Sequence, residues 1–407
     1  MTPFLQLISV LAIILIAAKL GGYLSTRLGQ PSVLGEILIG LLLGPSVVNL
    51  AHLGFITDTH LGEVVAHLGE LGVLLLMFLA GLELHLKDLA KSSRVSAFAG
   101  IIGVLVPVGL GLGAGYMFDM DFSHAMFLGL TLGATSVSIS AQTLIELKML
   151  RSRVGLGLLG AAVFDDILVI LLLSTYLAIE TGGSGLSSIL IVLGRMILFL
   201  GLSSAIGIWF LPWVTRITAK LPISQGLVTL AIVTLLFFGL AAELVGGMAA
   251  ITGTFLAGLM FARTPEKERI EEGLHALAYS FFVPIFFVNI GLSVNVRELD
   301  ASALWVMLVI SALAIIGKLV GAGGGAKLAH YSWRESLQLG IGMISRGEVG
   351  LIVAKVGLDQ DLISPDIFSA IVGMVLVTTL VTPPMLRAAF SPAKTPSQKA
   401  PATEEES

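Results

Sequence analysis

The sequence predicts an all-α polytopic membrane protein of about thirteen transmembrane helices. Hydrophobic residues make up 56% of the 407 residues, and only 12% are charged. Apolar runs of about 20 residues, the length that a helix needs to cross a bilayer, recur along the whole chain. The 47 glycines fit the same class, because small residues let membrane helices approach one another closely. This composition gives no support to nucleic-acid binding.

Thirteen apolar segments are long enough to span a lipid bilayer. Only residues 243–247 separate the eighth segment from the ninth. The polar, Pro-rich residues 391–407 predict a disordered cytoplasmic tail. In chain order, the segments lie at residues 3–24, 33–51, 62–84, 95–118, 123–147, 154–179, 186–215, 224–243, 246–262, 273–292, 301–326, 334–357 and 366–389.

The charges of the loops test this count independently. If the N-terminus is outside, the inner loops and the tail hold most of the 23 Lys and Arg residues, among them Lys148, Arg151 and Arg153. The outer loops hold only Arg297 and Lys355, together with acidic residues. This alternation follows the positive-inside rule, and a missed helix would disrupt it downstream. We therefore expect a multi-pass protein of a bacterial inner membrane, with the N-terminus outside and the C-terminus in the cytoplasm.

Several kinds of chemistry are excluded by residue type. The chain has no cysteine, which excludes disulfides, thiolate metal sites and thiol nucleophiles. The seven histidines show no metal-ligand spacing, and no nucleotide-binding loop of standard form occurs. We therefore expect no cofactor and no enzymatic activity.

Two adjacent carboxylates in the sixth segment form the first candidate site. Asp165 and Asp166 lie in an apolar run, about 18 to 20 Å along the helix from Arg153. Charged side chains are costly at this depth of a bilayer, so intramembrane acids are rare and usually functional. Neighbouring residues of a helix point about 100° apart, so the two acids cannot share one partner and should have different roles.

A basic residue of the eleventh segment lies at a similar depth. Lys318 precedes Lys327 by about 14 Å of helix, which places it close to the level of the two aspartates. A buried lysine keeps its charge when a carboxylate lies beside it. The sequence therefore predicts that Lys318 pairs with one of the two acids.

Two segments look interrupted at their midpoints. The fifth contains Thr135 and Ser136 in a run of small and hydroxyl residues, which loosen a helix, and the twelfth contains four glycines around Arg346 and Glu348. In transporters, the interrupted helices of two inverted repeats cross at the midplane, where freed backbone groups face the substrate. We therefore expect two inverted-topology repeats, helices one to six and eight to thirteen, with Arg346 and Glu348 balancing charge at the crossing.

The chain contains four characteristic motifs. They are the Thr-Ser break of helix five, the Asp-Asp pair of helix six, a Gly-Lys-Leu-Val-Gly run in helix eleven and an Arg-Gly-Glu-Val-Gly-Leu-Ile-Val run in helix twelve. Together they resemble the second monovalent cation:proton antiporter family, in its electrogenic bacterial Na+/H+ branch (NapA- and NhaA-like). The resemblance covers nearly the whole chain. It implies an NhaA-like fold.

The resemblance also implies a homodimer in which a mobile core moves against a scaffold. Residues 1–92 and 223–295 would form the scaffold, from helices one to three and eight to ten. Residues 93–180 and 296–390 would form the core, and residues 181–222 would supply the linking helix seven.

Individual residues take roles from the same resemblance. Asp166 would bind a cation or a proton in turn, and Asp165 would pair with Lys318. Thr135 and Ser136 would help the two aspartates to coordinate Na+. A single carboxylate that serves both ions makes exchange obligatory, because only a neutralised core crosses a membrane cheaply.

The expected function is exchange of Na+ or Li+ for H+ by alternating access. If Na+ joins the carboxylates, Lys318 loses its partner and releases a second proton, which would make the exchange electrogenic. K+/H+ antiport within the family stays open, because paired acids do not set ion size by themselves. A cation channel would use the same residues without a proton requirement. An aspartyl protease would need its two acids on different helices.

Overall fold

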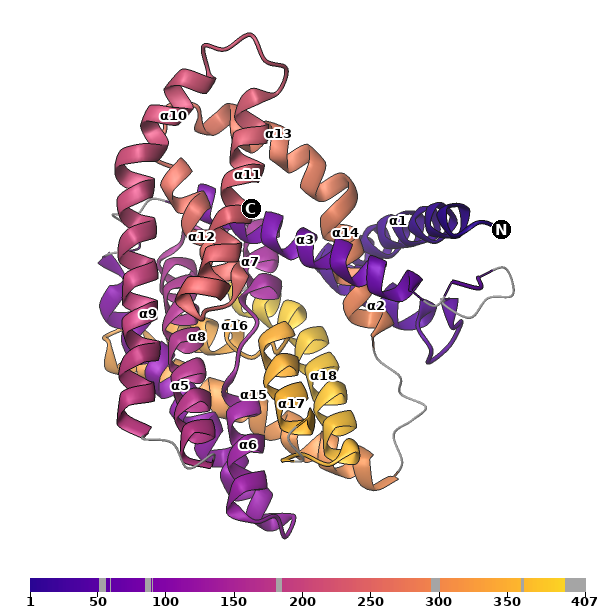
Figure 1. Ribbon diagram of the computed structural model, residues 1–407. Helices are drawn as coiled ribbons and strands as arrows, with labels where there is room; N and C mark the ends of the chain where they lie inside the picture. The colour runs from indigo at the N-terminus through magenta and orange to yellow at the C-terminus, as the bar shows by residue number, and fades with distance from the viewer. Residues whose placement is uncertain are drawn as a thin grey trace, which may run out of the picture.

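A computed structural model describes residues 1–50, 56–58, 60–84, 89, 91–180, 185–293, 301–359 and 362–391. All regular secondary structure in these ranges is helical (Figure 1). The expected tail from residue 392 lies outside the described residues. The helices are α1 Pro3–Arg27, α2 Ser32–Leu43, α3 Leu61–Leu82, α5 Ser93–Met117, α6 Phe122–Gly133, α7 Val137–Glu146, α8 Arg153–Glu180, α9 Gly185–Ala205, α10 Leu211–Thr218, α11 Gly226–Ala241, α12 Ala250–Phe261, α13 Lys267–Leu277, α14 Val283–Leu292, α15 Ala301–Leu328, α16 Trp333–Gly342, α17 Glu348–Asp359 and α18 Pro365–Phe390.

The all-helical membrane class is confirmed, but the number of spans differs from the prediction. Within the described residues, 10 helices are long and apolar enough to cross a membrane. The three expected spans outside this set are α2, α12 and the pair α16–α17. Helices α2 and α12 have 12 residues each, and the twelfth segment is divided into two short helices. The predicted count of thirteen full spans is therefore not reached.

Helix irregularities occur where the sequence predicts them. The fifth segment is divided between α6 and α7 at residues 134–136, and the twelfth between α16 and α17 at residues 343–347. The eighth and ninth segments separate at a π-helical turn, Ala242–Gly246, followed by Gly247, whose φ of 63° a residue without Cβ adopts readily. Short polar breaks of this kind persist at membrane depth only where protein or water surrounds them.

The helices pack as two bundles. The first bundle comprises α5 to α8 and α15 to α18, with α5 against α6, α8 and α15. The second bundle comprises α1 to α3 and α11 to α14, with α3 against α12 and α14. Figure 1 shows the first bundle in the lower part of the view and the second above it and to the right. Helix α9 packs along α8 and against the π-helical turn Ala242–Gly246.

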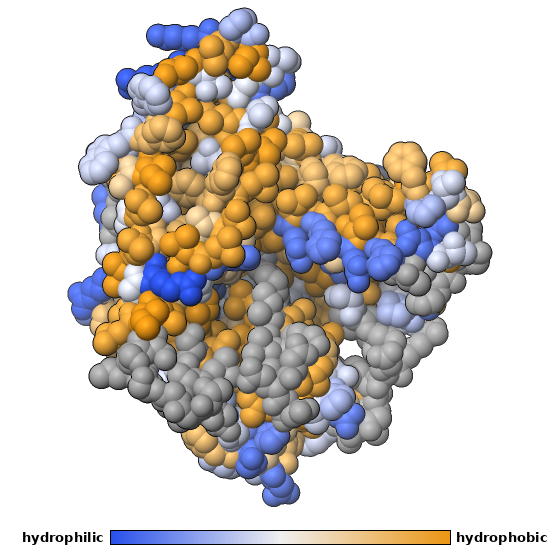
Figure 2. Space-filling model, in the orientation of Figure 1, coloured by the Kyte–Doolittle hydropathy of each residue, from blue (hydrophilic) through white to orange (hydrophobic). Residues whose placement is uncertain are grey.

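Large apolar side chains cover much of the outer surface (Figure 2). On α1, Phe4 and Ile16 are 68% and 63% exposed, and on the α9–α10 segment Ile197 and Trp209 are 63% and 79% exposed. Surfaces of this kind face lipid tails in a bilayer, because transfer of apolar area out of water is favourable.

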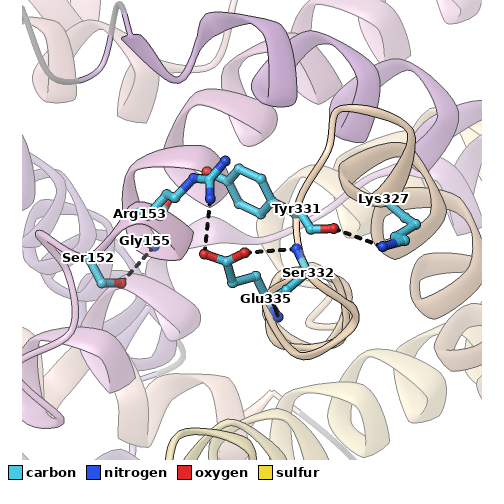
Figure 3. A network of polar contacts seen from close by, with 7 residues as sticks. All are labelled: Ser152, Arg153, Gly155, Lys327, Tyr331, Ser332 and Glu335. Atoms are coloured by element: carbon cyan, nitrogen blue, oxygen red, sulfur yellow. Dashed lines mark hydrogen bonds and ion pairs between the residues drawn. The ribbon is translucent and has the colours of Figure 1, made fainter.

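A polar network fixes the start of α8 against the turn between α15 and α16 (Figure 3). The Arg153 guanidinium lies 4.3 Å from the centre of the Tyr331 ring and 3.4 Å from Glu335 Oε1. The Tyr331 hydroxyl donates to the Arg153 carbonyl at 2.7 Å, and burial raises the pKa of this hydroxyl, which keeps it a donor. Ser332 and Glu335 form a capping box at the start of α16. These contacts fix the start of α8, the helix with the two aspartates, to the turn that follows α15, the helix with Lys318.

Close glycine contacts set the spacing of α3 and α12, and they generate a stability prediction. A Cβ built on Gly258 would lie 2.0 Å from the Phe78 carbonyl oxygen, whereas a Cβ on Gly113 of α5 would meet nothing within 4 Å. We expect Gly258→Ala to destabilise the protein by about 1–3 kcal/mol through overpacking. Gly113→Ala should be neutral or slightly stabilising, because glycine is unfavourable inside a helix. Thermal unfolding in detergent measures both, and equal midpoints for the two variants would contradict this packing.

Candidate ion-binding site

The two aspartates lie on α8 and point to different helices. Asp165 is fully buried and Asp166 is 5% exposed. Asp165 faces α15 of the first bundle, and Asp166 faces α12 of the second. The 100° turn between neighbouring residues of a helix accounts for this divergence. The expectation that the two acids have separate partners is therefore met.

Lys318 and Asp165 form a buried ion pair. The Lys318 ammonium donates to Asp165 Oδ1 at 2.5 Å, and both side chains are at most 1% exposed. Removing one member of such a pair typically costs several kcal/mol, because a buried charge is left uncompensated. The structure thus brings together the two groups that the sequence expected to meet.

Asp166 lines a small cavity between the two bundles. The Thr252 hydroxyl of α12 donates to Asp166 Oδ2 at 3.1 Å. The cavity has a volume of about 10 Å³, which is near the size of a single water. Its other walls are apolar, so a charge there is poorly solvated. These walls comprise Met77, Val137, Leu159, Ala162, Val163, Ile251 and Phe255.

The two broken segments cross beside the aspartates. The Ser136 N–H donates to the Ser345 carbonyl at 2.9 Å, and the Ser345 hydroxyl returns a bond to the Ser136 carbonyl at 2.7 Å. Ser140 donates to the Gly342 carbonyl at 2.6 Å. A Cβ on Gly347 would lie 2.6 Å from the Ser136 side chain, so the close approach needs glycine there. Each break therefore supplies hydrogen-bond partners for backbone N–H and carbonyl groups that the other break leaves without helical partners.

Arg346 neutralises helix ends at the crossing. Its guanidinium is fully buried and donates to the carbonyls of Met343 and Ile344 after α16, of Leu132 near the end of α6, and of Ala314. The C-terminal ends of helices carry partial negative charge, so a guanidinium stabilises them. Glu348 begins α17, and its side chain lies outside the described residues. Arg346 thus places its positive charge against backbone carbonyls at the crossing.

Two buried oxygens next to the ion pair have no hydrogen-bond partner beyond their own contact within the described part of the chain. They are Oγ1 of Thr135, which is 3% exposed, and Oδ2 of Asp165. Thr135 lies beside Asp165 at the break between α6 and α7. Buried oxygens of this kind are suited to a small cation, because hard cations prefer oxygen ligands. Among the described residues, no group of three His, Cys, Asp or Glu could hold a metal by itself.

A polar stripe on α3 leads toward the cavity. Glu63, His67 and Glu70 are exposed and recur on one face of the helix, and Met77 of the cavity wall follows on that face. Figure 2 shows the hydrophilic band along α3. Charged groups at membrane depth face water or protein in preference to lipid. The stripe therefore gives α3 a polar, exposed face in line with Met77 of the cavity wall.

Thr252 was missed by the sequence reasoning. It is one of two threonines in an apolar helix, with no charged neighbour and no motif around it. Only its place on α12, opposite α8, brings it to Asp166. A hydroxyl near an intramembrane acid cannot be distinguished by sequence spacing from one that bonds its own helix, as Thr234 does.

Substitution of each member of the ion pair, alone and together, tests whether the two charges compensate one another. Lys318→Gln and Asp165→Asn should each lower stability by about 3–5 kcal/mol, since each leaves one buried charge unpaired. The double variant should recover much of the loss, because both charges are gone. Thermal unfolding of the three purified variants tests this. Additive losses in the double variant would show that the two groups do not compensate one another.

The chain is similar to known proteins along nearly its whole length. Residues 12–391 match the model of the family described as sodium/hydrogen exchanger, transmembrane. The Na+/H+-K+ antiporter GerN of Bacillus cereus is 39% identical over 96% of this chain and 97% of its own. An Na+/H+ antiporter of Enterococcus hirae is 36% identical over 94% of this chain and 98% of its own.

A solved structure also matches. The sodium proton antiporter MjNhaP1 from Methanocaldococcus jannaschii, at pH 8, aligns with a TM-score of 0.69 over 95% of this chain and 97% of its own. At 16% identity this likeness shows the fold alone. The family match over nearly the whole length and the two bacterial relatives decide the assignment. The chain belongs to the transmembrane sodium/hydrogen exchanger family.

Proposed function

We propose that this protein exchanges Na+ or Li+ for H+ across a membrane by alternating access. The observation that carries the proposal is Asp166, a buried carboxylate that lines a small cavity of about 10 Å³ where the two bundles meet. A carboxylate in such a place needs neutralisation, and a proton and a small cation both provide it. Because one site cannot hold both, each ion binds only after the other has left, and the empty, charged site crosses the membrane poorly.

The geometry supplies the remaining parts of the exchange. Asp166 belongs to the first bundle and Thr252 to the second, so displacement of one bundle along the other would expose the carboxylate to either side in turn. Asp165, Thr135 and Ser136 lie at the helix crossing and would complete the shell of oxygen ligands around the cation. Asp165 would return to Lys318 when the cation leaves.

The proposal includes the roles of the two bundles, the repeats, the assembly and the orientation in the membrane. The first bundle would be the mobile core and the second the scaffold, with residues 181–222 linking them. The core and scaffold would consist of two inverted repeats, and two copies would form a homodimer. The N-terminus would lie outside and the C-terminus in the cytoplasm of a bacterial cell. The NapA- and NhaA-like branch stays a prediction.

K+/H+ exchange is the second candidate. The relative GerN, which is 39% identical, is named an Na+/H+-K+ antiporter. Hydroxyl and carboxylate oxygens bind both alkali cations, and the size of the cavity after movement of the bundles would decide between them. A panel of Li+, Na+ and K+ in the assay below separates the two candidates.

The first transport prediction concerns Asp166. In proteoliposomes with an internal pH dye, Asp166→Asn should abolish cation-dependent proton flux, because its amide cannot exchange a proton. Asp119→Asn is a matched control, since Asp119 is exposed in a turn with φ of 57°, a conformation that asparagine also adopts. Exchange at the normal rate in Asp166→Asn would overturn the proposal.

The second transport prediction concerns charge. If Lys318 contributes a second proton, Lys318→Gln should move less charge for each Na+ than the wild type. Currents on solid-supported membranes, normalised to Na+ flux, measure this ratio. Lys327→Gln, on the same helix at its basic end, should leave it unchanged. An unchanged ratio in Lys318→Gln would remove the lysine from the proton path.

A further inference from the structure

A carboxylate of the first bundle caps a helix of the second. Glu146 is the last residue of α7, and its two oxygens accept from the Ser32 N–H at 2.7 Å and from the Ser32 hydroxyl at 2.5 Å. Ser32 begins α2, and the N-cap residue of that helix is Pro31, which makes no side-chain cap. The first N–H groups of a helix need acceptors and carry partial positive charge. Glu146 supplies across the bundles what Pro31 cannot supply locally.

Further bonds extend this contact. Gln142, one turn before Glu146, donates to Glu146 Oε1 at 2.9 Å, and the Tyr279 hydroxyl donates to Gln142 Oε1 at 2.9 Å. Lys19 of α1 donates to the Tyr279 carbonyl at 2.8 Å. Tyr279 lies in the π-helical turn Ala278–Phe282 that joins α13 to α14. One end of α7 is therefore bonded to two elements of the second bundle, α2 and the π-helical turn, and Lys19 of α1 supports the second of them.

A second contact lies at the same end of the molecule. Gly29, in the turn between α1 and α2, has φ of 71°, and a Cβ there would lie 3.1 Å from Arg387 Nη2 of α18. α18 also belongs to the first bundle. The bundles thus meet at two places on one side of the molecule. The sequence places most of the basic loop residues on this side, which we call the basic side. The polar stripe Glu63, His67 and Glu70 approaches the cavity from the other end of α3.

We propose that the contact of Glu146 with Ser32 is the closed gate on the basic side of the Asp166 cavity. While the α2 N-terminus holds the α7 carboxylate, the Asp166 cavity is reached only past the polar stripe of α3. Opening toward the basic side requires both oxygens to leave Ser32. This inference rests on the proposed alternating access, since a gate has a function only if the bundles move.

A cross-link tests whether the two residues must separate. The chain has no cysteine, so Ser32→Cys with Glu146→Cys introduces a single reactive pair. Oxidation to the disulfide should abolish cation-dependent proton flux in proteoliposomes, and a reductant should restore it. Each single-cysteine variant, oxidised in the same way, should keep its flux. Normal flux in the cross-linked protein would overturn the gate.

A labelling experiment keeps the gate testable if the chain proves to carry no exchange. Val163→Cys places a thiol in the wall of the Asp166 cavity. In inside-out vesicles, Glu146→Ala should raise its rate of labelling by an impermeant maleimide about tenfold, the equilibrium shift expected for a lost charged hydrogen bond. Glu268→Ala, at an exposed acid of α13, should leave the rate unchanged. An unchanged rate in Glu146→Ala would overturn the gate and leave the proposed function to the flux assays.

Discussion

The cost of burying charge at bilayer depth organises this structure. Four charged side chains lie deep in the first bundle, and they are stabilised in different ways. Asp165 has Lys318 at 2.5 Å, and Arg346 has four backbone carbonyls. Asp166 receives a bond from the Thr252 hydroxyl of the second bundle. In the proposed exchange, a cation and a proton neutralise this carboxylate in turn.

The helix breaks serve the same requirement. An unbroken α6–α7 helix would satisfy its own carbonyls and leave nothing for a buried guanidinium to bond. The breaks free carbonyls near Leu132 and Ile344, and Arg346 takes them up. They also place Thr135 beside the aspartates. Polar side chains at the crossing and the irregular backbone there are therefore parts of one arrangement.

The sequence predicted the parts of the site that violate a rule of membrane helices. Asp165, Asp166, Lys318 and Arg346 are anomalous in apolar segments. Spacing along the helices therefore predicted that Lys318 lies near the depth of the two aspartates and pairs with one of them. Thr252 breaks no rule, and its role appears only when α12 lies against α8. The count of thirteen full spans is not confirmed, because hydropathy does not separate a full crossing from a 12-residue helix with apolar flanks or from two short helices in series.

The central claim is that one proton and one alkali cation compete for Asp166. Titration of purified protein with NaCl in a weakly buffered solution with a pH indicator tests this without a membrane. The account predicts that Na+ binding releases protons, that the apparent affinity for Na+ falls as the pH falls, and that Asp166→Asn releases none. Saturable Na+ binding to the wild type with no proton release would contradict the account.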